Sequence, residues 1–307
     1  MLILGTMAHL EDLDRSYTYA RDVSVTAVTV GSFAGGVGSL LPGGARTVWT
    51  LLDGERICRL DEFDVAPVVR LQQATAQSLA ASSKGNLVVG LQGAHLLTVS
   101  SDGAVSELGS FDAVEGRDTW KNPAAATPDL RSIAVSSDDA WFVNVHVGGV
   151  WRSTDEGKSW QSVIAPEADV HEIVAGQDGR LAVAAAVGFG WSLDGGDSWQ
   201  WTTQGLHAAY SRAVAIDGDT AFVTASTGPD TTDARLYKCR LGEPFVPCAG
   251  GLPESFPFNL DTGSVAASAG HVALGTHDGR VFRSSDLGLT WTLAASGLRR
   301  VHVLRFS

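Results

Sequence analysis

Imidazole side chains recur at one kind of position along this sequence. His95, His146 and His277 each come at or just after an apolar, strand-like run, and His9 lies at a similar place near the start. Imidazoles brought together from distant parts of a chain can ligate a transition metal or exchange protons near neutral pH. These four histidines are the candidate ligands for one ion of iron, copper, manganese or zinc. They lack H-x-H or H-E-x-x-H spacing, so ordinary polar loop residues are the alternative interpretation.

Arginines recur at a second kind of position. Arg131 and Arg212 each stand near the start of an alternating apolar run, and Arg300 stands at the same place near the end of the chain. Guanidinium groups gathered around one opening would create a local positive field suited to a carboxylate or phosphate. The alternative is that each arginine pairs with a nearby carboxylate such as Asp129 or Glu172.

Acid–base chemistry has its own candidates beside these arginines. His171 occupies the same place in its run as Arg131 and is followed by Glu172, so either residue could act as acid or base. Tyr210 would be the phenol closest to such a site. The three arginines, with His207 and with Trp120 from a long polar insertion, are the candidate substrate contacts.

Composition limits the class of protein. The 307 residues are 44% hydrophobic and only 18% charged, with 35 glycines and nine tryptophans, which is typical of a turn-rich all-β chain. A net charge of −12 argues against nucleic acid as the partner, because phosphate backbones require a basic footprint. The opening MLILGT has no basic flank and no long apolar run, so we expect a strand, no membrane segment and a cytoplasmic protein. No nucleotide cofactor is expected.

The cysteines do not form a disulfide framework. Cys58, Cys239 and Cys248 are too few for one. Cys239 and Cys248 could face each other across neighbouring strands, but strand partners rarely have disulfide geometry. We therefore expect free thiols, with a bridge between these two as the alternative.

One short segment occurs three times. It reads S-T-D-E-G-K-S-W, S-L-D-G-G-D-S-W and S-S-D-L-G-L-T-W, beginning at Ser153, Ser192 and Ser284. The shared aspartate can accept backbone N–H bonds within a tight turn, and the shared glycine permits a positive φ. The closing tryptophan can then pack between neighbouring sheets. The repeat therefore predicts a recurring structural turn.

These segments resemble the Asp boxes of bacterial neuraminidase repeats. The resemblance covers three units and implies a β-propeller, with each box in the hairpin between the third and fourth strands of a blade. A sialidase-type glycoside hydrolase is the activity that the resemblance suggests by association. We disfavour it, because the chain has no Arg-Ile-Pro motif and only four tyrosines, and because the box reports fold rather than catalysis.

The strands around the boxes predict the number of blades. An alternating strand, a short polar turn and a second apolar strand precede each box. The same strand–turn–strand pattern occurs three more times without a box. Its weakest copy reads GSLL, PGG, ARTVWTL and RICRL. The C-terminal VHVLRFS and the N-terminal MLILGT would share a further blade and close the ring. We expect one propeller domain over residues 1–307 with seven four-stranded blades; six is the alternative.

This arrangement predicts which face carries function. The boxes and the short turns between first and second strands share one face. The long insertions, at about 112–129, 226–233 and 253–262, fall on the other together with the candidate histidines and arginines. We expect an enzyme acting on a small anionic substrate at this end of the channel. A non-catalytic propeller that binds a protein partner is the alternative.

Overall fold

The chain folds almost entirely into antiparallel strands. The computed structural model describes residues 2–8, 17–19, 28–30, 35–42, 47–52, 54–61, 64–72, 74–123, 125–298 and 300–306. Helical structure in these ranges is limited to α1 (Gly109–Asp112) and the 3-10 turns η2 (Arg117–Thr119) and η3 (Pro166–Ala168). The all-β class expected from composition is confirmed. No helix in the described ranges is long and apolar enough to cross a membrane.

Six four-stranded antiparallel units contain most of the described strands. Their strands are β4 (Gly35–Pro42), β5 (Thr47–Leu52), β6 (Arg56–Asp61) and β7 (Asp64–Arg70); β8 (Ala76–Ala81), β9 (Leu87–Leu91), β10 (His95–Val99) and β11 (Val105–Glu107); β12 (Leu130–Val135), β13 (Trp141–Val145), β14 (Gly149–Ser153) and β15 (Gln161–Ile164); β16 (Val170–Ala175), β17 (Leu181–Ala185), β18 (Gly188–Ser192) and β19 (Gln200–Thr202); β20 (Tyr210–Asp217), β21 (Thr220–Ser226), β22 (Ala234–Arg240) and β23 (Val246–Pro247); β24 (Val265–Ser268), β25 (His271–Gly275), β26 (Val281–Ser284) and β27 (Thr292–Ala295). The segment with the weakest sequence pattern therefore forms a complete sheet, β4–β7.

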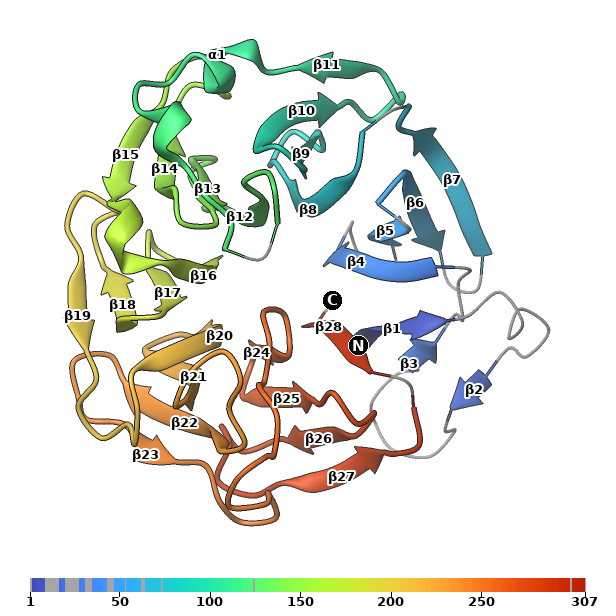
Figure 1. Ribbon diagram of the computed structural model, residues 1–307. Coiled ribbons are helices and arrows are strands. Elements are labelled where there is room, and N and C mark those ends of the chain that lie inside the picture. Colours follow the sequence, from blue (N-terminus) through green and yellow to red (C-terminus); the bar gives the residue numbers. More distant parts are fainter. Residues whose placement is uncertain are drawn as a thin grey trace.

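The remaining strands are β1 (Leu2–Ala8), β2 (Tyr17–Tyr19), β3 (Val28–Val30) and β28 (Val301–Phe306). The two ends of the chain pair with each other: β28 runs antiparallel to β1, with Leu2 opposite Phe306, and β1 continues to β4. The first strands of the sheets contact one another in the order β4, β8, β12, β16, β20, β24 and β28, and β28 returns to β4. Figure 1 shows the resulting ring, a β-propeller closed by its termini as the sequence predicts.

The repeated segment forms the same turn in all three places. Ser153 Oγ accepts the Gly157 N–H at 2.8 Å and donates to Asp155 Oδ1 at 2.8 Å. Asp155 also accepts the N–H and the hydroxyl of Ser159, at 2.9 and 2.6 Å. The same bonds recur around Asp194 and Asp286. Each turn joins the third and fourth strands of its sheet, as expected, and the glycine after the acid has positive φ (+79° at Gly157).

The core lies between the sheets. Each repeat tryptophan joins an apolar cluster that its own sheet shares with the preceding one, as the sequence predicts. Trp291, which is 4% exposed, packs in a cluster with Phe222 and Phe256. Trp160 contacts Phe111 with ring centroids 4.8 Å apart. Burying such side chains stabilises a fold by about 1.5–3 kcal/mol each. Contacts between sheets are therefore what holds the ring together.

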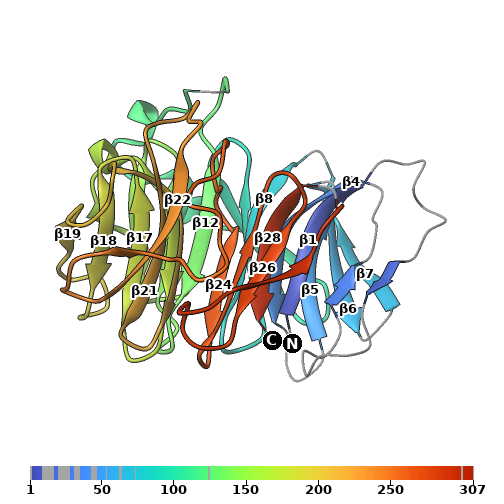
Figure 2. The same ribbon diagram turned by 90° about the horizontal axis from the view of Figure 1, so that it is seen from below.

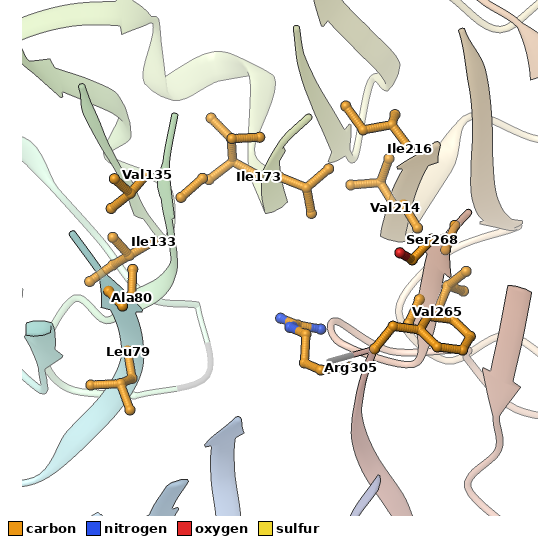
Figure 3. A pocket seen from close by; sticks show the side chains of 18 residues that line it. Leu79, Ala80, Ile133, Val135, Ile173, Val214, Ile216, Val265, Ser268 and Arg305 are labelled. Atoms are coloured by element: carbon orange, nitrogen blue, oxygen red, sulfur yellow. The ribbon is translucent and has the colours of Figure 1, made fainter. Parts of the chain in front are cut away.

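The first strands of the sheets surround a central channel. Near the ends of these strands a cavity of about 410 Å³ has aliphatic walls, with Ile133, Ile173 and Ile216 among its lining residues. Figure 3 shows the Arg305 side chain reaching into this otherwise apolar space. Among the residues that line this cavity, Arg305 is the only titratable one.

Cys239 and Cys248 are buried and are not bridged, as expected, and Cys58 is buried as well. Cys248 lies beside Leu236 of β22 rather than opposite Cys239, because Lys238 pairs with Val246 and Tyr237 with Pro247. Burial raises the pKa of both Cys239 and Cys248 to about 12, so both are thiols at neutral pH.

Removing one hydroxyl from a repeat turn should measure the turn's contribution to stability. Ser192 is 2% exposed, and its hydroxyl oxygen accepts the Gly196 N–H at 2.8 Å. We expect Ser192→Ala to lower the free energy of unfolding by about 1–2 kcal/mol, because a buried N–H loses its partner. Urea unfolding measures it, with Ser106→Ala on the exposed strand β11 as the control. Equal stability of the two variants would contradict the structural role of the turn.

The same turns should make stability sensitive to acid. The pKa of Asp155 and that of Asp194 lie at about 2 instead of 3.8, because the Ser159 and Ser198 hydroxyl and N–H groups bond the charged form. Stabilisation by these carboxylates is complete above pH of about 4 and is lost as the pH falls through about 2. We expect an Asp155→Asn, Asp194→Asn double variant to lose stability less steeply over this window than the wild type. Thermal unfolding at stepped pH tests this, with Glu107→Gln as control; identical slopes would refute it.

Candidate functional site

A recurring β-bulge places side chains at one end of the channel. Strand pairing skips Arg131 in β12 and His171 in β16, each the second residue of its strand. It also skips Gln77 in β8, and Arg212 with Ala213 in β20. A bulge leaves one residue unpaired and re-aims its side chain. Arg131, His171 and Arg212 are thus equivalent in backbone conformation, whereas the residue skipped in β28 is His302 and Arg300 precedes that strand.

The starts of β8, β12, β16 and β20 surround a cavity of about 550 Å³, which we call the mouth. Its polar lining residues are Gln77, Asn122, Asp129, Arg131, His146, Asp169, Tyr210 and Arg212. Figure 1 shows these four strands around the centre of the ring. Its volume falls within the range of small-molecule sites, and it collects residues from four successive sheets.

Arg131 and His146 face each other on one wall of the mouth. Arg131 Nη1 lies 3.2 Å from His146 Nε2. A guanidinium can only donate, so His146 Nε2 accepts and the imidazole carries its proton on Nδ1. Within the described ranges Arg131 forms no ion pair; Asp129 instead accepts from Gln77 at 2.7 Å. The pairing with Asp129 or Glu172 that could have neutralised Arg131 is therefore not formed.

His171 is held in a defined orientation on the neighbouring sheet. Its side chain is 1% exposed, and its Nδ1 lies 2.6 Å from the Ser211 carbonyl oxygen. A carbonyl can only accept, so Nδ1 carries a proton and Nε2 is the nitrogen left for other partners. His171 Nε2 lies 3.6 Å from Asp169 Oδ2, and His146 Nε2 lies 3.7 Å from Asp169 Oδ1. Both separations exceed a hydrogen bond.

The opposite wall carries a second arginine with its partners. Arg212 Nη1 donates to Asp261 Oδ1 at 2.5 Å, and Nη2 donates to the Tyr210 hydroxyl at 3.2 Å. Arg300 pairs with the other oxygen of Asp261. The Tyr210 ring lies 4.8 Å from the His171 ring. Asp261 thus fixes two guanidinium groups beside the mouth, and Tyr210 links them to the histidines.

Burial and neighbouring charges set the ionisation of the mouth. Burial, followed by Arg131, lowers the pKa of His146 to about 4, so this imidazole is neutral at pH 7. His171 is the main influence that lowers the pKa of Asp169, against the opposing effect of burial. Burial, followed by Arg212, lowers the pKa of Arg131, yet a guanidinium stays charged near neutrality. The mouth therefore combines a neutral imidazole, a carboxylate and an arginine without a carboxylate partner.

Glu172, a candidate acid or base, is engaged away from the mouth. It is 1% exposed, and its two oxygens accept the Val214 N–H at 3.0 Å and the Gly263 N–H at 3.1 Å. Arg305 lies 4.0 Å away, and burial raises the pKa of the carboxyl group. The side chain joins β16 to β20 and to the segment before β24, which is a structural environment.

Two of the predicted site residues, His95 and Trp120, instead pack against the first insertion. His95 Nδ1 lies 2.8 Å from Asp112, on the exposed side of α1. Trp120 is 7% exposed and packs 5.7 Å from Trp151 in the apolar cluster beneath the insertion. Neither lines the mouth. The indole and the imidazole secure the insertion to its sheet.

The other candidates lie apart from the His146–His171 pair. His207 Nδ1 lies 2.9 Å from the Tyr237 hydroxyl, and the His277 ring lies 5.6 Å from Phe258. His9 is outside the described residues. Of the three expected metal ligands that the structure describes, His146 alone belongs to a cluster of metal-ligating groups, because His95 and His277 lie in other sheets beside Asp112 and Phe258.

Residues that sequence reasoning overlooked complete the mouth. Asp169 precedes His171 by two residues, just as Asp129 precedes Arg131. This Asp-x-His/Arg spacing is the signal that could have found them. Asp169 ends the 3-10 turn η3 with φ +48°, a conformation that aspartate tolerates better than most residues. Asp261 lies in the connection between β23 and β24, which lacks this Asp-x-His/Arg spacing.

Comparisons with known proteins establish the fold. No family model matches the sequence, and no curated protein matches it. Many solved structures do, among them the GH74 enzyme of Niastella koreensis, with a TM-score of 0.60 and 16% identity over 85% of this chain and 45% of that one. This chain thus spans less than half of that enzyme.

Propellers of other classes are similar to the same degree. The WD40 repeats of RRP9 match with a TM-score of 0.63 and 14% identity, covering 88% of this chain and 84% of that one. YCF48 bound to D1 peptide matches with a TM-score of 0.54 and 12% identity, covering 84% and 81%. Enzymes and WD40 propellers therefore both share this architecture, and identities this low show the fold alone.

The environment of Glu172 generates a test of its structural role. Glu172→Gln preserves the shape but turns an NH₂ group toward one of two buried backbone N–H donors. We expect the free energy of unfolding to fall by about 1–3 kcal/mol, because that donor loses its acceptor. Urea unfolding measures the change, with Glu167→Gln on the exposed turn η3 as the matched control. A variant as stable as the control would show that the two backbone bonds contribute little.

Proposed function

We propose that the mouth binds a small molecule carrying a carboxylate or phosphate group, and that the protein is an enzyme acting on it. The observation that carries this proposal is Arg131, a charged guanidinium at a bulge, which lines a cavity of about 550 Å³ and forms no ion pair within the described ranges. Guanidinium groups bind carboxylates and phosphates through paired N–H donors. A bound anion would supply the missing countercharge.

Neighbouring groups support the same interpretation. The nearby carboxylates have other partners: Asp261 is shared by Arg212 and Arg300, and Asp129 accepts from Gln77. The Tyr210 hydroxyl lines the cavity and would offer a further polar contact. His171 is buried behind this wall, with its ring 4.8 Å from that of Tyr210, and its Nε2 has no hydrogen-bond partner among the described residues.

A protein-binding propeller is the second candidate. Its support is the similarity in fold to YCF48 bound to D1 peptide and to WD40 repeats. In that case Arg131 and Arg212 would receive an acidic side chain or a terminal carboxylate of the partner. The size of the mouth, about 550 Å³, favours the small molecule, because it falls within the range of small-molecule sites.

We also infer that the ring has seven blades and that the repeat turns are Asp boxes. The first strands of the sheets, β4, β8, β12, β16, β20, β24 and β28, contact one another around the channel. β28 pairs with β1, β1 lies beside β3, and β3 pairs with β2, so these four strands would form the blade that joins the termini. The identical bonding of the three turns supports the box assignment.

Titration with simple anions tests the proposed site. We expect inorganic phosphate or succinate to bind in isothermal titration calorimetry at constant ionic strength. Arg131→Gln and Arg212→Gln should each weaken binding by about 10- to 100-fold, because each removes a charged hydrogen-bond donor. Arg240→Gln is the matched control, since Arg240 on β22 has a side chain that is 67% exposed and pairs only at 3.5 Å with Asp219.

The outcome separates the two candidates. Saturable binding of a small anion that depends on Arg131 supports the small-molecule site. Binding confined to peptides, with the same arginine dependence, would favour the protein-binding alternative. Failure of every anion, or equal affinity in the Arg131→Gln variant, would overturn the proposal.

A further inference from the structure

Three donor groups of the kind that ligate transition metals meet at the mouth. His146, Asp169 and His171 each offer one atom such that all three atoms lie within 4.8 Å of one another. His146 follows β13, whereas Asp169 and His171 flank the first residue of β16, so the group joins two neighbouring sheets. His171 Nε2 lies 3.6 Å from Asp169 Oδ2 and His146 Nε2 lies 3.7 Å from Asp169 Oδ1, so both nitrogens approach the same carboxylate through its two oxygens.

The orientation of His171 points to a ligand that is not part of the protein. Its Nδ1 is committed to the Ser211 carbonyl at 2.6 Å, which directs Nε2 toward Asp169. Such a bond from the second ring nitrogen is the usual way in which proteins orient a metal-ligating histidine. His171 Nε2 and Asp169 Oδ1 are both buried without a hydrogen-bond partner among the described residues. Buried polar atoms without partners are rare, and a bound ion would satisfy both.

The donor set also selects the kind of ion. Two imidazoles and one carboxylate suit zinc, iron and other divalent first-row metals, whereas magnesium and calcium prefer sites built from oxygen atoms. Three protein ligands leave a coordination position open for water or substrate. Arg131 and Tyr210 line the cavity beside this position.

Arg131 makes the metal and the anion interdependent. Its Nη1 uses the lone pair of His146 Nε2 that a metal would need, at 3.2 Å. An entering cation would therefore displace the guanidinium from His146. The released guanidinium could pair with an anionic group bound at the open coordination position.

We propose that His146, Asp169 and His171 bind one divalent first-row transition-metal ion through the two Nε2 atoms and the Asp169 carboxylate, with the open position facing the mouth. This inference rests on the proposed function in taking the mouth as the reactive site, and it adds the group that would bind the anionic substrate. The metal site is nevertheless defined by its own three ligands and is tested without any anion.

The test uses the full chain after treatment with a chelator. Zn²⁺ alone is titrated by calorimetry, and Co²⁺ alone is followed by its visible absorption, which strengthens when the ion leaves water for a four-coordinate protein site. We expect one equivalent of either ion to bind. His146→Ala and Asp169→Asn should each weaken binding by more than about 100-fold. His207→Ala is the control, because this histidine contacts Tyr237 instead of the cluster.

Two further measurements keep the result interpretable. Asp169 is 28% exposed in its side chain, so Asp169→Asn should fold, and circular dichroism with thermal unfolding verifies this. Arg131→Gln should bind the metal at least as tightly as the wild type, because a competitor for His146 Nε2 is removed. It should still lose affinity for phosphate and succinate if the proposed function holds.

The results that overturn the inference are distinct from those that overturn the proposed function. No stoichiometric binding of Zn²⁺ or Co²⁺ by the folded wild type, or undiminished binding by folded Asp169→Asn and His146→Ala, excludes the metal site. Loss of metal binding in Arg131→Gln would contradict the assignment of His146 Nε2 as a ligand. Neither result bears on anion binding by the chelator-treated protein.

Discussion

A hydrogen bond between the residue after the bulge and the next inner strand, formed in β8, β12 and β16, is the interaction that sets the geometry of the mouth. Ser78 donates to the Leu130 carbonyl at 2.8 Å, Ser132 accepts the Ile173 N–H at 3.1 Å, and Glu172 accepts the Val214 N–H at 3.0 Å. All three bonds are buried. The residue that makes this bond directly follows the residue at the bulge. The bond therefore fixes the position of the bulged side chain relative to the neighbouring sheet. Arg131, His171 and Arg212 can then act on one another across sheets.

The fold was largely predictable because its signals are local. Alternating strands, short polar turns and the Ser-x-Asp-x-Gly segments each depend on residues a few positions apart, and their bonding follows from those residue types. The pairing of the terminal strands was also predictable, since an open ring would leave two unpaired sheet edges. The bulges were not, because skipping Arg131 or His171 changes the pairing register without requiring any particular residue. The strands that pair beside β1 were likewise not predictable, because β2 and β3 are three residues long and have weak sequence patterns.

The candidate site was predictable in part, for a related reason. Arg131, His171 and Arg212 stand at corresponding positions in their strands, so repetition alone placed them near one opening. The expected metal ligands were placed together because they follow corresponding strands. Corresponding positions in different sheets are distributed around the ring, however, and need not be in contact. His95 shows this: the insertion next to it supplies Asp112 as its partner. Asp169 escaped notice because its proximity to both histidines depends on the tight turn before β16, whose shape the sequence does not display.

The pairing of Leu2 with Phe306 also determines how this molecule can be joined to others. Arg300 lies beside the mouth with Asp261, whereas Arg305 and Phe306 line the far cavity of the channel, so β28 crosses the ring from one face to the other. Figure 2 shows both chain ends together on one side of the disc. A tag, a linker or another protein attached at either end would therefore lie on the face opposite the mouth. Immobilising the molecule by a terminus would leave the face that carries the mouth exposed to solvent.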